Sequence, residues 1–311
     1  MSSEVPAAKR RRAEKTFDWK LVLSTPQTFK TLLAIIEPTV SNVPFQVCKD
    51  DDSKSGAPFS GLRLDAMNNS KICMVKAAYQ CEVVVSDTLR NEWFCVDTDL
   101  LKTLLRDVQA THVIELIRYT ASDVVTIKTY NKSDTSNWSV STIQLVEDEG
   151  NATELDMFNL TFDHVVEIEL AQLKSICNIV NSINSSVIEF RVDEPAEKTL
   201  EKHHFFTIAA EGEGASIQKV HHSVTVREEN ENLIKVDTNS QVSPEDTDLD
   251  DVVNRFTGKF PTVYLNGVLK SMERQTIQLF LSRDLPLVLS YSLGNDLSYI
   301  KVVLAPREGD A

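Results

Sequence analysis

The octapeptide DLLKTLLR, residues 99–106, places Lys102 and Arg106 one helical turn apart beside a run of leucines. Its central word is an apolar residue, a lysine, a threonine or serine, and a second apolar residue, and this word occurs at three further places. The lysines of the four words are residues 30, 102, 174 and 270, so the first three are 72 residues apart and the last follows after 96. A word that recurs at such spacing predicts a duplicated fold.

Each copy of the word lies in a segment whose apolar residues follow the spacing i, i+3, i+4 and i+7. This spacing predicts an amphipathic helix with one buried face. The lysine of each word falls beside that face, so we expect all four lysines to lie in solvent. The predicted faces are Phe29, Leu32, Leu33 and Ile36; Leu101, Leu104, Leu105 and Val108; Leu173, Ile176, Cys177 and Val180; and Leu265, Val268, Leu269 and Met272.

Short segments rich in β-branched and aromatic residues separate these helices and predict strands. The clearest are residues 113–119, 124–130, 187–192, 276–281 and 287–291. Each half of the chain then holds a helix, strands, a second helix and more strands. The acidic stretch 147–151 divides the halves, and the additional residues of the second half fit the polar, acidic stretch 228–251. The sequence therefore predicts an α+β fold built from a duplicated domain.

The charge of the chain limits how it can contact nucleic acid. A net charge of -14 and a pI near 4.9 argue against a protein that wraps nucleic acid with its whole surface. If the helices share one side, their cations form a local basic surface that fits a phosphate backbone bound without base readout. The residues expected on this DNA-binding surface are Lys30, Lys102, Arg106, Lys174 and Lys270.

Several other classes of protein are disfavoured by the sequence. Five cysteines without a CxxC pair suggest neither a disulfide framework nor a zinc site. We expect a soluble protein inside the cell, because apolar runs stay well below the roughly 18 residues of a membrane span. The histidine pairs at 203–204 and 221–222 each supply one ligand to a sheet face, so we expect no metal. Without a recognisable nucleophile or phosphate loop, we expect neither an enzyme nor a cofactor.

Several segments resemble one family. LSRDLPLVLSY (residues 281–291) and LAPR (residues 304–307) are similar to the end of proliferating cell nuclear antigen (PCNA), the DNA sliding clamp family. FDWKL (17–21), GLRLDAM (61–67) and YLN (264–266) resemble it too, in the same order. The resemblance implies the processivity fold: a duplicated two-domain clamp with helices lining the inner face and antiparallel sheets outside. It also implies a homotrimeric ring around double-stranded DNA, without catalytic activity, that binds DNA polymerase, a clamp loader and replication and repair clients.

The resemblance also assigns domains and a partner site. Residues 1–16 would be a basic disordered tail, 17–144 clamp domain 1, 145–162 the interdomain connecting loop and 163–311 clamp domain 2. Subunits would join through edge strands near 138–145 and 215–224. The third helix has Ser175 and Asn178 where the family often carries arginines, so we expect weak DNA contact there. Clients with a clamp-binding motif would contact Met67, Lys71, Ile72, Met74, Leu155, Met157, Pro286, Leu304, Ala305 and Pro306.

Two other functions stay open on the sequence. One is a subunit of a heterotrimeric checkpoint clamp in DNA damage signalling, and the other is a monomeric, clamp-like viral processivity factor. Self-association separates these three functions. The basic stretch PAAKRRRAEK, residues 6–15, resembles a nuclear localisation signal, so we expect the nucleus, or the host nucleus if the protein is viral.

Overall fold

The chain repeats one order of elements: a strand, a helix, five strands, a second helix and three strands. The computed structural model describes residues 16–52, 58–86, 92–148, 160–195, 203–228, 231–241, 252–273, 276–295 and 297–307. Domain 1 comprises β1 (Phe17–Leu23), α1 (Pro26–Ile36), β2 (Asn42–Asp52), β3 (Pro58–Met67), β4 (Cys73–Gln80), β5 (Glu82–Val85), β6 (Glu92–Asp97), α2 (Thr98–Leu104), β7 (His112–Tyr119), β8 (Val124–Asn131) and β9 (Asp134–Gln144). Domain 2 comprises β10 (His164–Glu169), α3 (Leu170–Ser182), β11 (Val187–Pro195), β12 (His203–Gly212), β13 (Ala215–Glu228), β14 (Glu231–Gln241), β15 (Val252–Pro261), α4 (Thr262–Lys270), β16 (Thr276–Leu281), β17 (Leu287–Ser292) and β18 (Tyr299–Leu304). The predicted duplicated α+β fold is confirmed.

The helices bury the faces that the sequence predicts. Pro26 stands in the first turn of α1, and the Asp97 side chain caps α2 by accepting a hydrogen bond from the Leu100 backbone N–H at 2.7 Å. The predicted faces of α1, α3 and α4 are buried, whereas Leu104 of α2 is only half-buried. Because α2 ends at Leu104, Val108 of its predicted face packs from beyond the helix.

The strands form two sheets. One has five strands in the order β5-β1-β7-β8-β9, and the other has thirteen in the order β15-β11-β12-β13-β14-β10-β16-β17-β18-β4-β3-β2-β6. The larger sheet is continuous because β18 of domain 2 pairs antiparallel with β4 of domain 1. This β18–β4 seam contains six residue pairs, from Tyr299 opposite Ala78 to Leu304 opposite Cys73. A single hydrophobic interior, which includes Trp19 and Leu304, then spans both domains.

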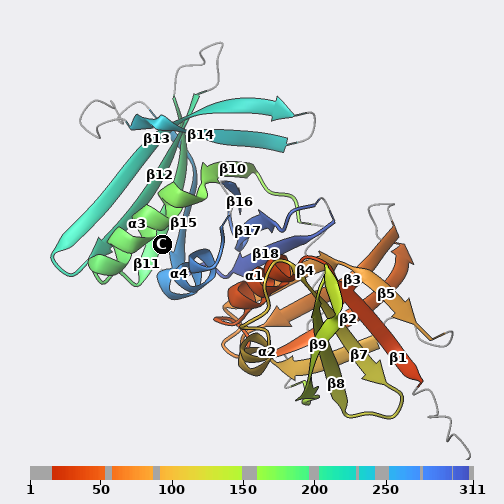
Figure 1. Ribbon diagram of the computed structural model, residues 1–311. Helices are drawn as coiled ribbons and strands as arrows, with labels where there is room; N and C mark the ends of the chain where they lie inside the picture. The colour runs from red at the N-terminus through yellow and green to blue at the C-terminus, as the bar shows by residue number, and fades with distance from the viewer. Residues whose placement is uncertain are drawn as a thin grey trace, which may run out of the picture.

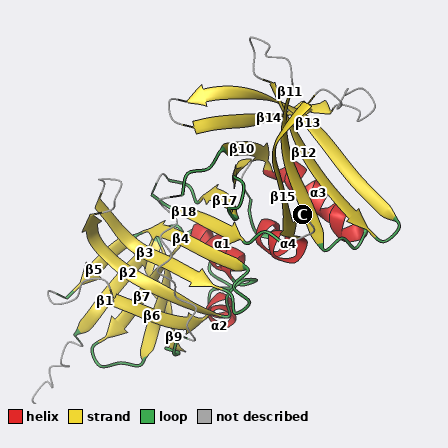
Figure 2. Ribbon diagram, turned by 180° about the vertical axis from the view of Figure 1, so that it is seen from behind, coloured by secondary structure: helices red, strands yellow, loops and turns green. Residues whose placement is uncertain are grey.

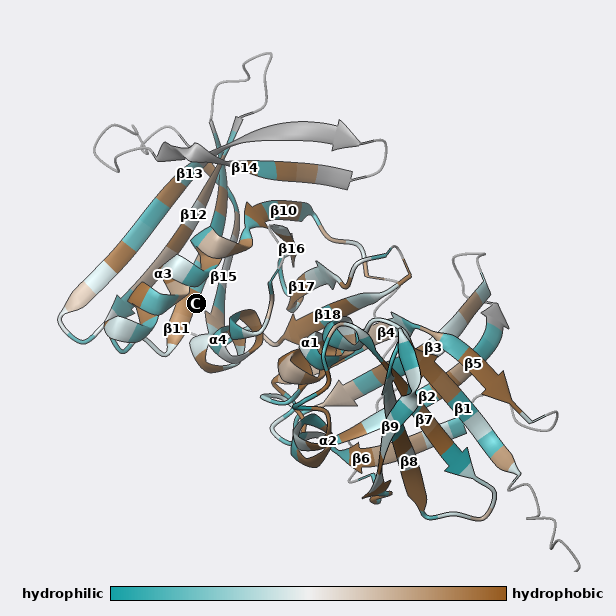
Figure 3. Cartoon of the chain, in the orientation of Figure 1, coloured by the Kyte–Doolittle hydropathy of each residue, from teal (hydrophilic) through white to brown (hydrophobic). Residues whose placement is uncertain are grey.

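The helices lie together on one side of the molecule, with the sheets behind them (Figures 1 and 2). Neighbouring helices contact each other in the order α3, α4, α1, α2, so the row crosses from domain 2 to domain 1. The strands bury one side against the helices and turn the other outward, as the alternation of hydrophilic and hydrophobic residues along β13 illustrates (Figure 3). The expected helices on one face and sheets on the other are therefore present, and the described strand pairs are antiparallel except for β10 with β14.

Domain 2 departs from domain 1 at β14. The predicted insertion at 228–251 contains this strand, which pairs antiparallel with β13 and parallel with β10. In domain 1 the place beside the first strand is taken by β5, which follows β4 directly and pairs antiparallel with β1. The predicted insertion therefore contains a strand, longer than β5, at the place that β5 takes in domain 1, instead of forming only a loop.

The expected interdomain connection falls between β9, which ends at Gln144, and β10, which begins at His164. Residues 149–159 of this segment lie outside the described residues, and so do the basic stretch 6–15 and residues 242–251 of the insertion. No helix in the described part of the chain is long and apolar enough to cross a membrane.

Candidate functional site

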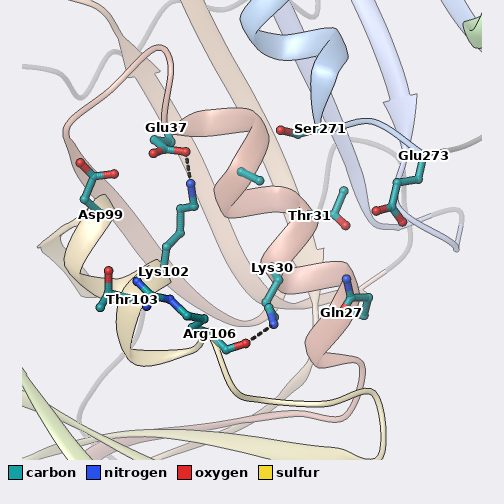
Figure 4. A pocket seen from close by; sticks show the side chains of 11 residues that line it. Gln27, Lys30, Thr31, Glu37, Asp99, Lys102, Thr103, Arg106, Ser271 and Glu273 are labelled. Atoms are coloured by element: carbon teal, nitrogen blue, oxygen red, sulfur yellow. Dashed lines mark hydrogen bonds and ion pairs between the residues drawn. The ribbon is translucent and has the colours of Figure 1, made fainter.

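Three of the five predicted DNA-binding residues line one cavity on the helical side of domain 1. The cavity has a volume of about 680 Å³ and lies between α1, α2 and the end of α4 (Figure 4). It contains three cations, Lys30, Lys102 and Arg106, and three carboxylates. Its charge is therefore balanced, which is less positive than the basic surface that the sequence predicts. The lining residues are Gln27, Lys30, Thr31, Ala34, Glu37, Asp99, Lys102, Thr103, Arg106, Ser271 and Glu273.

Lys30 does not extend into solvent. Its Nζ donates hydrogen bonds to the backbone oxygens of Arg106 at 2.9 Å and Val108 at 3.1 Å, just after α2 (Figure 4). Both carbonyls lie beyond the last turn of α2, so the helix does not supply their hydrogen bonds, and the Lys30 ammonium group provides a charged donor to each. Lys30 therefore connects α1 to the chain that leaves α2, and its half-buried position corrects the expectation that it lies free in solvent.

Lys174 makes the same kind of connection in domain 2. Its Nζ donates to the backbone oxygens of Met272 at 2.6 Å and of Lys270 at 3.4 Å, at the end of α4. Like Lys30, Lys174 is half-buried, and here too the expected solvent position is wrong. In each half, the lysine of the first helix thus binds the chain at or just after the end of the second helix.

The other three cations differ from one another in their surroundings. Lys102 forms an ion pair with Glu37 of the α1 C-cap, and partial burial lowers the pKa of its ammonium group. Arg106 and Lys270 are exposed, and no hydrogen bond or ion pair engages either side chain within the described residues. These two cations are the ones free to contact a phosphate. Whether any of the five binds DNA stays a prediction.

A second candidate surface lies on the outer side of the large sheet, opposite the helices. Met74, Val288 and Val303 form a buried apolar cluster there, against which Met67, Phe162 and Phe280 pack. The rings of Phe162 and Phe280 meet edge to face with centroids 5.6 Å apart. We call these six residues the outer cluster.

The predicted partner-binding residues surround the outer cluster without all facing it. Met67 and Met74 belong to it, Lys71 is exposed, and Ile72 keeps 37% of its surface in solvent. The Ile72 backbone oxygen accepts a hydrogen bond from the Ala305 N–H at 2.8 Å, so two predicted segments meet here. Pro286 and Ala305 are half-buried, Pro306 is exposed, Leu304 is fully buried in the interior, and Leu155 and Met157 lie outside the described residues.

Sequence reasoning missed part of this surface. Val288, Val303, Phe162 and Phe280 were not among the predicted residues, although alternation along β17 and β18 carries the signal. Leu287 and Leu304 point inward, so the neighbouring Val288 and Val303 must point outward. Identifying a strand residue as a contact residue requires knowing which face of the sheet it occupies.

Charged side chains continue the outer face beside the outer cluster. Lys301 places its Nζ 5.7 Å from the centroid of the Phe280 ring, and Lys76 pairs with Asp65 at 3.3 Å. Burial raises the pKa of the Asp65 carboxyl to about 6, although Lys76 and Arg63 act in the opposite direction. The outer face therefore combines an apolar centre with a partly desolvated charged border, as protein interfaces commonly do.

Three histidines of domain 2, His164, His204 and His221, are buried. His221 is fully buried and its Nδ1 lies 3.2 Å from the Gln172 side-chain nitrogen on α3, whereas His204 stacks edge to face with His164 at 6.5 Å. Burial lowers the pKa of both His164 and His221. No group of three or more metal-ligating side chains occurs among the described residues. The His164–His204 contact had no recognisable signal in the sequence.

Two strand edges complete the candidate site. β9 is the last strand of its sheet, and its Trp138 and Val140 are 58% and 48% exposed. β13 is paired with β12 on one side and, from His221 onward, with β14 on the other. The edge predicted at 215–224 is therefore open only from Ala215 to Val220, because β14 covers the rest.

Comparison with solved structures agrees with this architecture, although the comparisons by sequence find no match. Neither a protein-family model nor a curated protein sequence matches the chain. The structure is similar to that of PCNA from Entamoeba histolytica, with a TM-score of 0.68, 15% identity, and coverage of 94% of this chain and 100% of that one. It is also similar to PCNA from Thermococcus kodakaraensis, with a TM-score of 0.66, 17% identity, and coverage of 93% and 100%. At these identities the likeness establishes the fold alone, and that fold is the PCNA-like sliding clamp.

Proposed function

We propose that this chain, which has the fold of a sliding clamp, closes with two further copies into a ring around duplex DNA. The ring would slide without reading sequence and would tether DNA polymerase, a clamp loader and other replication and repair proteins, with no catalytic step of its own. The observation that supports this most directly is the β18–β4 seam, because the chain offers a second pair of edges that correspond to those of the seam.

β9 corresponds to β18. After β9, the Val146 N–H donates to the Cys95 oxygen at 3.0 Å, and after β18 the Arg307 N–H donates to the Lys259 oxygen at 2.8 Å. Cys95 and Lys259 each stand two residues before the N-cap of the second helix of their domain. Val146 and Arg307 are therefore equivalent, and so are the residues three positions before them, Ile143 and Leu304.

β13 corresponds to β4. Tyr79 of β4 lies opposite Leu62 of the preceding strand, β3. In the same way, His221 of β13 lies opposite Phe206 of the preceding strand, β12. Both side chains reach the start of the first helix of their domain: the Tyr79 hydroxyl lies 2.8 Å from the Thr25 hydroxyl, and His221 contacts Gln172 of α3. Tyr79 and His221 are therefore equivalent, and Cys73 corresponds to Ala215.

The seam thus supplies a template for contact between copies. Leu304 lies opposite Cys73 within one chain, so Ile143 of one copy is expected opposite Ala215 of the next. By the same transfer, Trp138 lies opposite Val220. An exposed edge strand invites pairing, and two different edges that match each other generate a head-to-tail ring when the rotation closes.

Three copies would provide six joints, namely three seams and three contacts between copies. If the joints are alike, each turns the assembly by about 60° and six of them complete a circle. The shared side of the four helices would then line the hole, and Arg106 and Lys270 would reach phosphates without contacting bases.

Native mass spectrometry of the purified chain tests the ring directly. We expect a homotrimer at micromolar concentration that stays on a nicked circular plasmid after loading and leaves when the plasmid is linearised. A chain that stays monomeric while binding DNA would support a monomeric processivity factor, and a chain that assembles only with different partners would support a checkpoint subunit. Either result would refute the homotrimeric clamp.

We further propose that the basic stretch at residues 6–15 directs the protein to the nucleus. The three consecutive arginines 10–12 and Lys9 supply the cluster of charge that import signals use. A fluorescent fusion should be nuclear, and replacing residues 9–12 by alanine should distribute it through the cell. An unchanged nuclear signal would refute this assignment.

A further inference from the structure

We infer that the inserted strand β14 acts as an end-stop that fixes the register in which a second copy of this chain pairs with β13. The inference rests on the proposed ring and adds a role for the segment that distinguishes domain 2 from domain 1. It concerns the edge of β13 that faces away from β12.

β14 occupies one part of this edge and leaves the other part open. Its residues pair regularly with β13 from Val236 opposite Ser223 to Glu231 opposite Glu228, and after a register shift Gln241 pairs with His221. On its other side β14 pairs with β10 through residues 233–235, so it is held within the sheet. The open part of the β13 edge is therefore Ala215 to Val220, six residues long.

The open part of the β13 edge has as many residues as the β18–β4 seam has residue pairs. In the seam, β18 contributes six residue pairs and the last of them is Tyr299 opposite Ala78. Transferred to two copies, the last pair is Trp138 opposite Val220. The very next residue of β13, His221, is already paired with β14. The register expected from the internal repeat thus ends where β14 begins.

An end-stop is useful because strand pairing alone does not fix register. A slip by two residues keeps every side chain on its original face of the sheet, so the buried and exposed patterns oppose it only weakly. A slip toward β14 would place Thr142 opposite Gln218 and drive Trp138 past Val220 into β14. A slip away from β14 would place Trp138 opposite Gln218 and reduce the six pairs to four. The expected register is the one that fills the open edge.

Paired cysteines measure the register in the full-length protein. Directly opposite residues in an antiparallel pair have Cα atoms about 4.5–5.5 Å apart, within the range for a disulfide, while diagonal neighbours are about 7–8 Å apart. Three double variants share Gln218→Cys and differ in the partner: Val140→Cys for the expected register, Thr142→Cys for the slip toward β14, and Trp138→Cys for the slip away. All four positions are exposed, which makes the variants a matched set.

We expect mild oxidation to crosslink the Val140→Cys variant into dimers and trimers at least tenfold more than either slipped variant. The single variant Gln218→Cys controls for the five native cysteines, four of which are buried. Equal or greater crosslinking of the Thr142→Cys or Trp138→Cys variant would overturn the inference. A protein that is monomeric by native mass spectrometry before oxidation would instead refute the proposed ring, so the two failures are distinguishable.

A deletion then tests whether β14 is the cause. Removing residues 229–245 leaves six residues between β13 and β15, the same length as the connection between β5 and β6. In this background we expect the Thr142→Cys variant to gain crosslinking. If the shortened chain folds and still crosslinks only through Val140→Cys, β14 does not set the register. Should the deletion prevent folding, the full-length series still decides whether pairing ends at β14.

Discussion

Replacing Lys30 with glutamine should destabilise domain 1 while leaving DNA affinity nearly unchanged. The substitution removes the ammonium group that donates to the backbone oxygens of Arg106 and Val108. Hydrogen bonds that involve a charged group typically contribute about 1.5–3 kcal/mol each. Because the lysine is only half-buried and water can reach the freed carbonyls, we expect a loss of about 1.5–3 kcal/mol for the two bonds together.

Arg106→Gln is the matched control, since it removes the same charge from the same cavity. Its side chain is exposed and engages no hydrogen bond or ion pair within the described residues. Substitutions of this kind usually change the free energy of unfolding by less than about 0.5 kcal/mol. If Arg106 contacts a phosphate, however, its loss should lower the slope of log K against log salt by about 0.9 for each contact removed.

The protein carries a convenient reporter for this experiment. Its three tryptophans, Trp19, Trp93 and Trp138, all lie in domain 1, so tryptophan fluorescence follows the unfolding of that domain. With a urea dependence of about 2 kcal/mol per molar, Lys30→Gln should lower the unfolding midpoint by about 1 M, and Arg106→Gln should leave it in place. DNA binding by fluorescence anisotropy at several salt concentrations supplies the second measurement. An unchanged midpoint for Lys30→Gln together with a salt slope reduced as much as for Arg106→Gln would refute the reasoning.

Three further outcomes follow from the described residues. Burial lowers the pKa of His164 and His221, so below about pH 6.5 the unfolded chain takes up protons that the folded histidines do not, and this contribution lowers the melting temperature from pH 7.5 to 5.5. Asp65, whose pKa burial raises to about 6, contributes in the opposite direction. Relative to the wild type, His164→Gln should raise the melting temperature at pH 5.5 more than at pH 7.5, and an equal effect at both pH values would contradict this assignment. Ile72→Ser should weaken the binding of a synthetic client peptide that carries an apolar and aromatic plug about tenfold in a calorimetric titration, because it removes apolar surface beside the outer cluster. Val263→Ser on the exposed helical face is the control, and equal affinity for both variants would exclude this site. Trp138→Asp should convert the proposed ring to monomers in native mass spectra without lowering the melting temperature, and a persistent trimer would argue against the β9 contact.

The sequence predicts the helices well because their information is local. Phe29, Leu32 and Leu33 define a buried face through spacing alone, and the structure confirms it. The destination of Lys30 is different, because its partners are backbone oxygens 76 and 78 residues away. Periodicity shows on which side of a helix a residue lies. It does not show which distant segment of the chain packs beside that residue.

The strands show the same limit in another form. Residues 276–281 and 287–291 were predicted as strands and form β16 and β17, but their composition does not tell which face each residue takes. Leu304 was therefore predicted as a partner contact and is fully buried in the interior. The polar stretch 228–251 lacks the apolar run of a typical strand, so pairing of β14 with β10 and β13 was not foreseen.

The β18–β4 seam also determines in which order the chain can complete its fold. β4 is finished at residue 80, whereas β18 ends at Leu304, 224 residues later. At roughly 5–20 residues per second, the edge of β4 waits about 11–45 s for its partner on the ribosome. Throughout this interval the edges exposed by domain 1 include those of β4 and β9, and β9 is the internal counterpart of β18. Neighbouring nascent chains on one messenger therefore carry edges that fit each other, and domain 1 produced alone should join head to tail through β9 and β4 and, at about 60° for each joint, close into rings of six copies.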